Sequence, residues 1–385
     1  KINSNTSLKS KVAVKIKKRV RLSKSRKSKE LKKISDFSKN KDGDGKKRKF
    51  NKKGDKAFNL NSSGNVKATI NNEGNMIISV GDSAGDRNIE RAQWIDMVKE
   101  LGGKELDWQG SSLNGNIQVV DEVNLPENSS NLFYGIKGNL IGADKLNTSK
   151  VTNMYAMFKL ARSANPDVSN WDVSKVFHMG KMFDGAASAN PDVSKWNISN
   201  VKYMSFMFFF ASSANPDVSK WDTSAVKSMG SMFEGATSAN PDVSKWDTAG
   251  VENMDSMFKE ATSANPDVSN WETLKLTNIT NIFYKASSAN PDVSKWNTSG
   301  VTDMYGVFRY SAIRKADISK WNIRRDVSSS NMFCGCKNLE YLKTANGLKT
   351  AADEINKDFK VVKLKKGSEA IVEKESINLN SYFTI

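Results

Sequence analysis

Apolar positions recur through the middle of the chain with a fixed period of 25 residues. Tryptophan marks this period at Trp171, Trp196, Trp221, Trp246, Trp271, Trp296 and Trp321. A phenylalanine follows each tryptophan at a constant interval, and the last of them is Phe333. A constant period of this length is typical of a solenoid, because one unit cannot bury its apolar face without stacked neighbours. We therefore expect a repeat solenoid over residues 146–333.

Each unit combines two patterns, which residues 215–239 show most clearly. The spacing Val218-x-x-Trp221-x-Thr223 is that of a leucine-rich repeat and predicts a short strand. The next apolar residues fall on one stripe of a helix, with Ser224 at its N-cap and Gly235 in its last turn: Val226, Met229, Met232, Phe233 and Ala236. The sequence thus predicts an α/β repeat solenoid, leucine-rich-repeat-like, with one short strand and one short helix per unit.

Other segments flank this array. Residues 58–145 predict an N-terminal α+β cap with a degenerate first repeat, containing strands at 66–70 and 76–80 and a helix over 88–101. Residues 334–385 predict a C-terminal cap with strands at 361–364, 370–372 and 377–379. Such caps are expected because the open ends of a solenoid otherwise aggregate.

The charge of the chain is concentrated in one tail. Residues 1–57 hold 23 Lys and Arg against 5 Asp and Glu, a net of +18, whereas the whole chain carries +17. This composition predicts a disordered basic arm. Its candidate contacts for polyanions such as heparin, nucleic acid or an anionic membrane surface are Lys15, Lys17, Lys18, Arg19, Arg21, Lys46, Lys47, Arg48 and Lys49. The segment Asn40–Asn51 has a faint calcium-loop pattern, but it lacks the final glutamate.

Residue counts exclude several classes of site. The chain has one histidine, His178, and two cysteines, Cys334 and Cys336, which is too few for a zinc site or a disulfide framework. We expect no catalytic residues, no metal and no cofactor. There is no apolar run of about 18 residues, so no transmembrane segment is expected. The sequence begins with Lys1, and we expect its native start, with any export signal, to lie upstream.

Three periodic residue types have both a structural and a functional interpretation. The methionines fit a core better than a soft-metal site, because Ile279 and Ile282 replace them in one unit. The tryptophans are expected to point inward, although an exposed row would suit a carbohydrate. The aspartate before each valine, as in Asp217, is expected to accept backbone N–H groups in a turn. A calcium ladder is the alternative.

The strongest candidate binding site is the set of residues beside each tryptophan. Leucine-rich arrays place such residues on their concave face, which is the usual binding surface of a solenoid. We call this set the tryptophan-flanking strip: Lys195, Asn197, Lys220, Asp222, Lys245, Asp247, Lys295, Asn297 and Lys320. The alternative is that the strip only keeps the surface soluble, because its residues hardly vary between units. His178 lies beside a core position and is expected to face solvent.

The units W-D-T-S-x-V-x-x-M-x-x-M-F and the segment Leu125–Phe133 resemble the BspA-like leucine-rich repeat surface proteins, abundant in mycoplasmas and lactobacilli. The resemblance covers roughly residues 125–340. It implies export, a place at the cell surface or secretion, and attachment without enzymatic activity. We therefore expect a non-enzymatic surface protein that mediates adhesion by binding a protein or glycan, including host-derived ones. The alternative is a nucleic-acid- or polyanion-binding protein that acts through residues 1–57.

Overall fold

The computed structural model describes residues 55–104, 107, 110–111, 113–323, 327–343, 360–362 and 370–373. The chain splits into two compact units, Lys1–Asp55 and Lys56–Ile385, and the second contains nearly all described residues. The strand β1 (Lys56–Asn59) begins this second unit, two residues inside the segment expected to be a basic arm. The basic residues proposed for polyanion contact and the faint calcium loop lie outside the described residues.

A mixed sheet forms the N-terminal end of the second unit. Its order is β1, β2 (Val66–Ile70), β3 (Met76–Val80), β4 (Ile117–Val119) and β6 (Leu140–Ile141). The first three strands are antiparallel and the last three are parallel. The strands predicted at 66–70 and 76–80 are confirmed.

The helix α2 (Arg91–Glu100) confirms the helix predicted over 88–101, although it begins three residues later. Trp94 is fully buried beneath it, and its indole N–H donates to the carbonyl of Leu132 (3.1 Å). The Trp94 ring also meets Phe133 edge to face, with ring centroids 5.6 Å apart. These contacts cover the first unit of the repeat array. Between this helix and the array lie β5 (Val123–Asn124), the short 3-10 helix η1 (Ala143–Lys145) and β7 (Leu146–Asn147).

A second sheet lies at the other end, with the order β10 (Lys360–Val362), β11 (Ala370–Glu373), β9 (Tyr341–Lys343) and β8 (Lys315–Asp317). It confirms the strand predicted at 370–372 and overlaps the one predicted at 361–364. The strand predicted at 377–379 lies outside the described residues.

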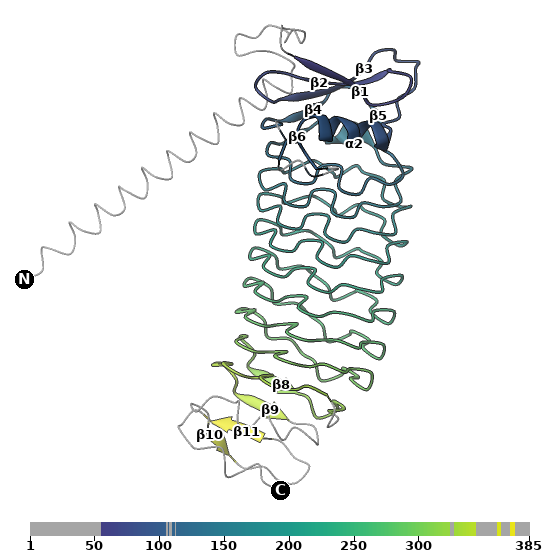
Figure 1. Cartoon of the computed structure of the whole chain (residues 1–385). Coiled ribbons are helices and arrows are strands. Elements are labelled where there is room, and N and C mark those ends of the chain that lie inside the picture. Colours follow the sequence, from purple (N-terminus) through teal and green to yellow (C-terminus); the bar gives the residue numbers. More distant parts are fainter. Residues whose placement is uncertain are drawn as a thin grey trace, which may run out of the picture. The chain divides into compact units, whose positions relative to one another are not determined.

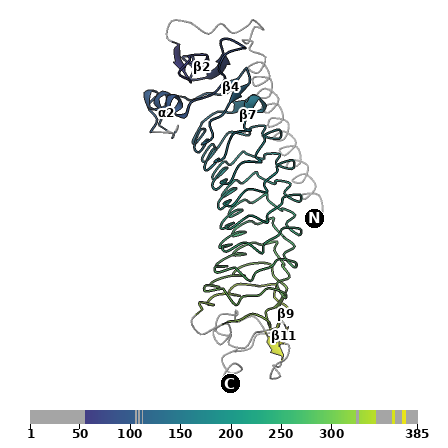
Figure 2. The same cartoon turned by 90° about the vertical axis from the view of Figure 1, so that its right-hand side faces the viewer.

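Between the two sheets, the 25-residue units lie one upon the next along the chain (Figure 1). Figure 2 shows the same succession after a turn of 90°. Adjacent units are joined by backbone hydrogen bonds, in which an N–H of one unit donates to a carbonyl 24 residues later. In the middle of the array the donor and acceptor pairs are Met204 and Ser228, Phe206 and Gly230, Phe208 and Met232, and Phe210 and Glu234.

The expected strand and helix of each unit are wrong. From residue 148 to residue 314, a stretch that is entirely described, the chain forms turns and isolated bridges and contains neither element. Ser231 and Gly235 have positive φ (54° and 68°), a backbone region closed to a right-handed helix. Each is the third residue of a tight turn, closed by Met232 N–H to Met229 and by Ala236 N–H to Phe233. In a helix these backbone N–H groups would donate to carbonyls of the same helix. Here the N–H groups of Met229, Ser231 and Phe233 donate to carbonyls of the next unit instead.

The predicted core is nevertheless correct. All five residues predicted to form the helical stripe of one unit are fully buried: Val226, Met229, Met232, Phe233 and Ala236. Phenylalanines from successive units stack in a ladder, with Phe208 and Phe233 centroids 5.6 Å apart and their planes within 6°. Ile279 and Ile282 occupy the two methionine positions of their unit and are equally buried. The methionines are therefore packing residues.

Candidate binding surface

The tryptophans point inward, as predicted. Each is between 1% and 5% exposed from Trp171 to Trp321. From Trp196 to Trp321 the indole N–H groups donate to a valine carbonyl of the preceding unit, for example Trp221 to Val193 (3.1 Å), and Trp171 donates to the carbonyl of Ala143 (2.8 Å). Stacked pairs such as Trp271 and Trp296 lie with centroids 6.2 Å apart. No ring face is open to a ligand in this row, so a tryptophan carbohydrate platform is excluded.

The tryptophan-flanking strip lies on the surface directly over this buried row. All of its members are exposed, and the lysine positions repeat every 25 residues. The nine residues are Lys195, Asn197, Lys220, Asp222, Lys245, Asp247, Lys295, Asn297 and Lys320. In each unit a buried, hydrogen-bonded tryptophan lies between the lysine and the Asn or Asp of the strip. The strip therefore presents regularly spaced amines and amide or carboxylate oxygens.

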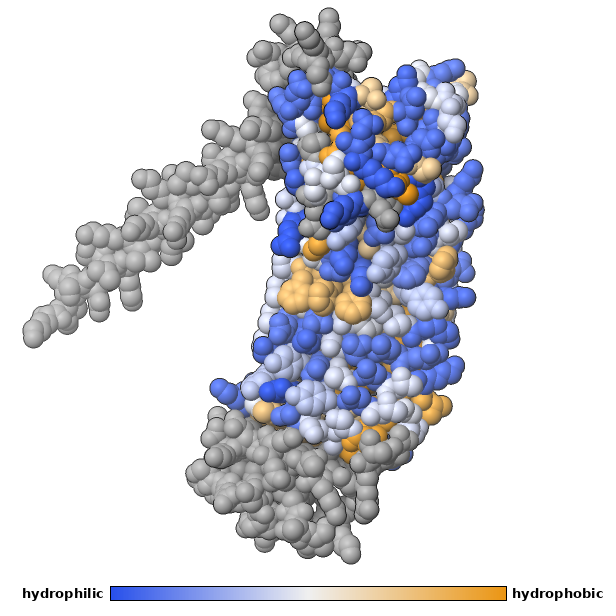
Figure 3. All heavy atoms as spheres, viewed as in Figure 1, coloured by the Kyte–Doolittle hydropathy of each residue, from blue (hydrophilic) through white to orange (hydrophobic). Residues whose placement is uncertain are grey.

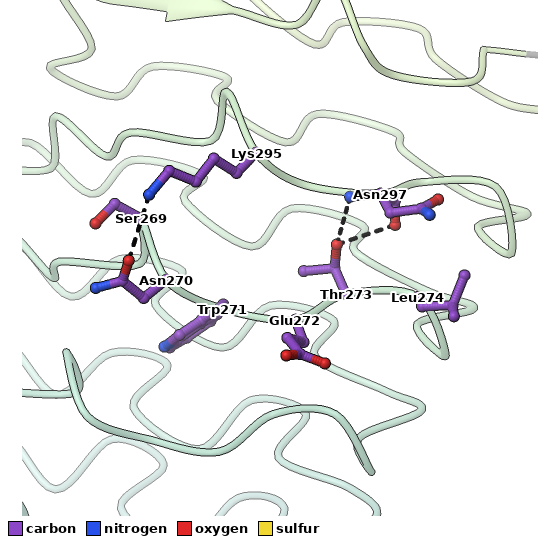
Figure 4. A pocket seen from close by; sticks show the side chains of 8 residues that line it. All are labelled: Ser269, Asn270, Trp271, Glu272, Thr273, Leu274, Lys295 and Asn297. Atoms are coloured by element: carbon purple, nitrogen blue, oxygen red, sulfur yellow. Dashed lines mark hydrogen bonds between the residues drawn. The ribbon is translucent and has the colours of Figure 1, made fainter.

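Two shallow pockets open on this strip, each between consecutive units. One, of about 500 Å³, is lined by Lys195, Asn197, Lys220 and Asp222 among others. The second, of about 340 Å³, is lined by Asn270, Glu272, Leu274, Lys295 and Asn297 together with Trp271 (Figure 4). In it the Lys295 ammonium donates to the Asn270 side-chain oxygen at 3.4 Å. The Thr273 hydroxyl ties the units together through the backbone of Asn297.

The aspartates before each valine act as turn caps, as predicted. Asp217 accepts the backbone N–H of Ser219 at 3.1 Å and its hydroxyl at 2.7 Å. The same two hydrogen bonds, from the serine hydroxyl first and its amide second, lower the pKa of Asp192, Asp217, Asp242 and Asp267. Within the described part of the chain, no three His, Cys, Asp or Glu residues gather as metal ligands would.

The strip carries a second cap that the sequence did not suggest. Asp222 accepts the amide and hydroxyl of Ser224 at 3.1 and 2.6 Å, and these bonds lower the pKa of Asp222. Asn197 does the same with Ser199. Ser224 is therefore a donor to a turn and not a helix N-cap. The oxygens of Asp222 and Asn197 are partly committed to the backbone, which leaves the lysines as the freer groups of the strip.

His178, predicted to face solvent, is only partly exposed. Its Nδ1 accepts the amide of Gly180 at 3.1 Å. Asn153 and Asn253 accept the equivalent amide in their own units. Burial lowers the pKa of the histidine. His178 is thus a turn cap that lies between two rings, Tyr155 at 5.0 Å and Tyr203 at 5.4 Å.

The thiol of Cys336 is not an activated nucleophile. Cys336 is buried, and burial raises the pKa of its thiol to about 12. Its sulfur hydrogen-bonds to the carbonyl of Phe308 at 2.9 Å. A thiol that stays protonated is a poor nucleophile. Among the residues with an assigned structure, none forms a helix that could cross a bilayer.

The outward residues of the tight turns, which we call the turn segment (residues 202–210 in one unit), include exposed aromatic side chains that were not among the predicted site residues. Phe177, Tyr203, Phe210 and Tyr310 are each between 41% and 46% exposed. The available signal was variation: at these positions the residue changes from unit to unit, whereas the residues around tryptophan stay nearly constant.

Comparisons with known proteins identify the array. No curated protein and no solved structure matches the chain. A family model described as "Mycoplasma protein of unknown function, DUF285" matches twice, at residues 127–246 and 227–346. Together the matches span 127–346, which is 220 of 385 residues and more than half of the chain. The chain therefore belongs to this Mycoplasma family of unknown function, DUF285.

Proposed function

We propose that this protein is a non-enzymatic, surface-exposed repeat protein that binds a host or matrix macromolecule through the tryptophan-flanking strip. The observation that carries the proposal is the pair of pockets that open on the strip between consecutive units. An extended row of similar shallow sites suits a long partner better than a small substrate. Membership of a Mycoplasma repeat family supports a BspA-like solenoid at the cell surface.

The test reverses charge on the strip. Lys220→Glu together with Lys245→Glu should reduce attachment of the purified protein to cultured host cells or to immobilised matrix proteins. The matched control is Lys175→Glu together with Lys275→Glu, which changes the same charge at two exposed lysines that are not members of the strip. Equal attachment by both variants and the unmodified protein would refute a role for the strip.

A second candidate function, polyanion binding, rests on the net charge of +18 in residues 1–57. A lysine-rich segment binds phosphate or sulfate by releasing counterions, so its affinity falls steeply with salt. Removal of residues 1–55, which leaves the compact unit from Lys56 onward intact, should abolish most heparin and RNA binding. If the shortened protein keeps the same affinity and the same salt slope, the polyanion site lies in the array.

A further inference from the structure

The two surfaces of the array differ in how much they vary. The outward residues of the turn segment form what we call the variable face; in one unit these are Lys202, Tyr203, Ser205, Phe206, Phe209 and Phe210. One unit later, the last two of these positions are Glu234 and Gly235. The strip, in contrast, repeats lysine and an Asx residue almost unchanged.

The variable face and the strip lie on different sides of the core. The buried phenylalanine of the turn segment meets the buried tryptophan of the strip inside the array, as in Phe258 and Trp271 with centroids 6.4 Å apart. The two rings stack inside the core, and the exposed residues beside them belong to different parts of the surface. A ligand on the variable face would therefore not contact the strip.

Exposed aromatic rings concentrate on the variable face. Among the described residues, five large apolar side chains are exposed; Phe177, Tyr203, Phe210 and Tyr310 are on this face, and Leu274 lies elsewhere. Figure 3 shows an apolar patch part-way along the array among mostly hydrophilic side chains, with further apolar atoms near the two ends. Exposed apolar patches on a folded protein commonly mark a binding site.

Phe210 and Tyr310 share an unusual support. Each is followed one unit later by a glycine with positive φ, Gly235 (68°) and Gly335 (72°). A Cβ on Gly235 would lie 2.7 Å from Cδ1 of Phe210, and a Cβ on Gly335 would likewise collide with the Tyr310 ring. Both rings therefore lie directly against glycine backbone, with another side open to solvent. They are flat platforms whose orientation is fixed before a ligand arrives.

A second ring packs against each platform, and a cation lies on the same face. Phe209 meets Phe210 edge to face (4.7 Å, 73°), and Tyr284 meets Tyr310 in the same way (6.0 Å, 81°). The guanidinium of Arg309 lies 5.2 Å from the Tyr310 ring and donates to the Tyr305 hydroxyl at 3.0 Å.

At the other platform the cation is Lys181. Its ammonium lies 5.2 Å from the ring of Phe206, which itself packs against Phe209. The two platforms are 100 residues apart, or four units of 25. At about 4.8 Å per unit they are separated by roughly 19 Å along the array.

We propose that the variable face binds an anionic polysaccharide that runs along the array, with sugar rings stacked on Phe210 and Tyr310. The C–H face of a pyranose packs against an aromatic face, and its carboxylate or sulfate groups suit Lys181 and Arg309. A protein anchor would instead need a pocket to enter, and these rings lie flush on backbone.

This inference rests on the proposed function in one respect, that the protein acts by binding a macromolecule. The binding surface is different, because the inference concerns the variable face and the proposed function concerns the strip. The experiment measures affinity of the full chain for hyaluronan, which carries carboxylates, and for chondroitin sulfate, which adds sulfates. Dextran is the neutral comparison and poly(U) is the nucleic-acid comparison. All titrations use about 0.5 M NaCl, where binding by a lysine-rich arm is strongly weakened.

Phe210→Ala combined with Tyr310→Ala should lower affinity for at least one anionic polysaccharide by about tenfold or more. Asn72→Ala changes an exposed side chain in the turn between β2 and β3, outside both the variable face and the strip, and should change nothing. Arg309→Gln should weaken binding of the anionic polysaccharide. Dextran should bind to the unmodified protein less well than hyaluronan or chondroitin sulfate does.

Three results would overturn the inference. Unchanged affinity in the double variant would exclude the rings as platforms. An equal loss for poly(U) would assign the face to nucleic acid. Loss in Lys220→Glu with Lys245→Glu, but not in the ring variant, would place the polysaccharide on the strip, and the proposed function would then stand without this inference.

Discussion

The indole N–H of Trp246 donates a hydrogen bond of 3.1 Å to the carbonyl of Val218, which lies 28 residues earlier in the preceding unit. The same tryptophan stacks on Trp221 with centroids 6.2 Å apart. One side chain thus closes a polar and an apolar contact across the same boundary between units. The indole hydrogen bond to a valine recurs from Trp196 to Trp321, and the stack recurs in the pairs Trp271–Trp296 and Trp296–Trp321.

Trp246→Ala should lower the free energy of unfolding by about 3–5 kcal/mol, because it leaves a cavity in a closely packed row. Trp246→Phe keeps a ring but leaves the Val218 carbonyl without its donor, and should cost about 1–3 kcal/mol. Urea unfolding followed by circular dichroism measures both. Leu274→Ala is the exposed control and should stay within about 0.5 kcal/mol of the unmodified protein. A neutral Trp246→Ala would contradict the inward orientation.

Asp222→Ala should cost about 1 kcal/mol, because the amide and hydroxyl of Ser224 lose their acceptor. Asp222→Asn should be nearly neutral at pH 7, since Asn197 makes the same cap in its unit. Chemical unfolding of the two variants at neutral pH provides the comparison. Equal losses in both would mean that the charge, and not the hydrogen bonds, stabilises the turn.

Acid should destabilise the array through the capping aspartates. Hydrogen bonds lower the folded-state pKa of Asp192, Asp217, Asp222, Asp242 and Asp267. Their contribution is therefore present above the unfolded-state pKa of about 3.9 and is lost as pH falls through the lower folded value. Thermal unfolding between neutral pH and about pH 3 should show this decline. The decline of the melting temperature with falling pH should be shallower in Asp222→Asn than in the unmodified protein. An identical decline would argue against the capping aspartates as the cause of acid destabilisation.

Gly235→Ala should destabilise the protein by about 1–2 kcal/mol through its left-handed backbone alone. The added methyl group would also displace the ring of Phe210. In a Phe210→Ala background the second cost disappears, so the two substitutions should be less than additive. A double-mutant cycle measured by urea unfolding gives this coupling. Strict additivity would show that Phe210 does not lie on Gly235 in solution.

Calcium should leave the melting temperature unchanged, because each aspartate of the ladder already serves the serine two residues later. Differential scanning fluorimetry with and without calcium tests this. A rise of the melting temperature that chelator and Asp242→Asn both abolish would restore the calcium ladder.

The sequence predicted which residues are buried far better than the backbone conformation. Met229, Met232, Phe233 and Ala236 fit a helical stripe, and all are buried. A run of tight turns with two left-handed residues places side chains inward at similar intervals, so side-chain periodicity cannot distinguish it from a helix. Ser231 at φ 54° carries no local signal for that conformation, which is imposed by hydrogen bonds to the neighbouring unit.

The candidate site was predicted unevenly for a related reason. The strip could be found because its residues keep a constant interval from tryptophan. Phe210 and Gly235 form a platform only when two residues 25 positions apart come into contact, and neither is unusual in its own unit. A comparison of equivalent positions between units, not along one unit, would have shown this pair.

The constant register between neighbouring units has a consequence for variation in length. Each boundary uses the same N–H to carbonyl offset of 24 residues, so a unit can be inserted or removed without creating a new kind of junction. Duplication or loss of one 75-base segment would move the N-terminal and C-terminal sheets relative to each other by one step of about 4.8 Å. The array can thus serve as an adjustable spacer whose length changes by recombination while the hydrogen bonds between neighbouring units stay the same.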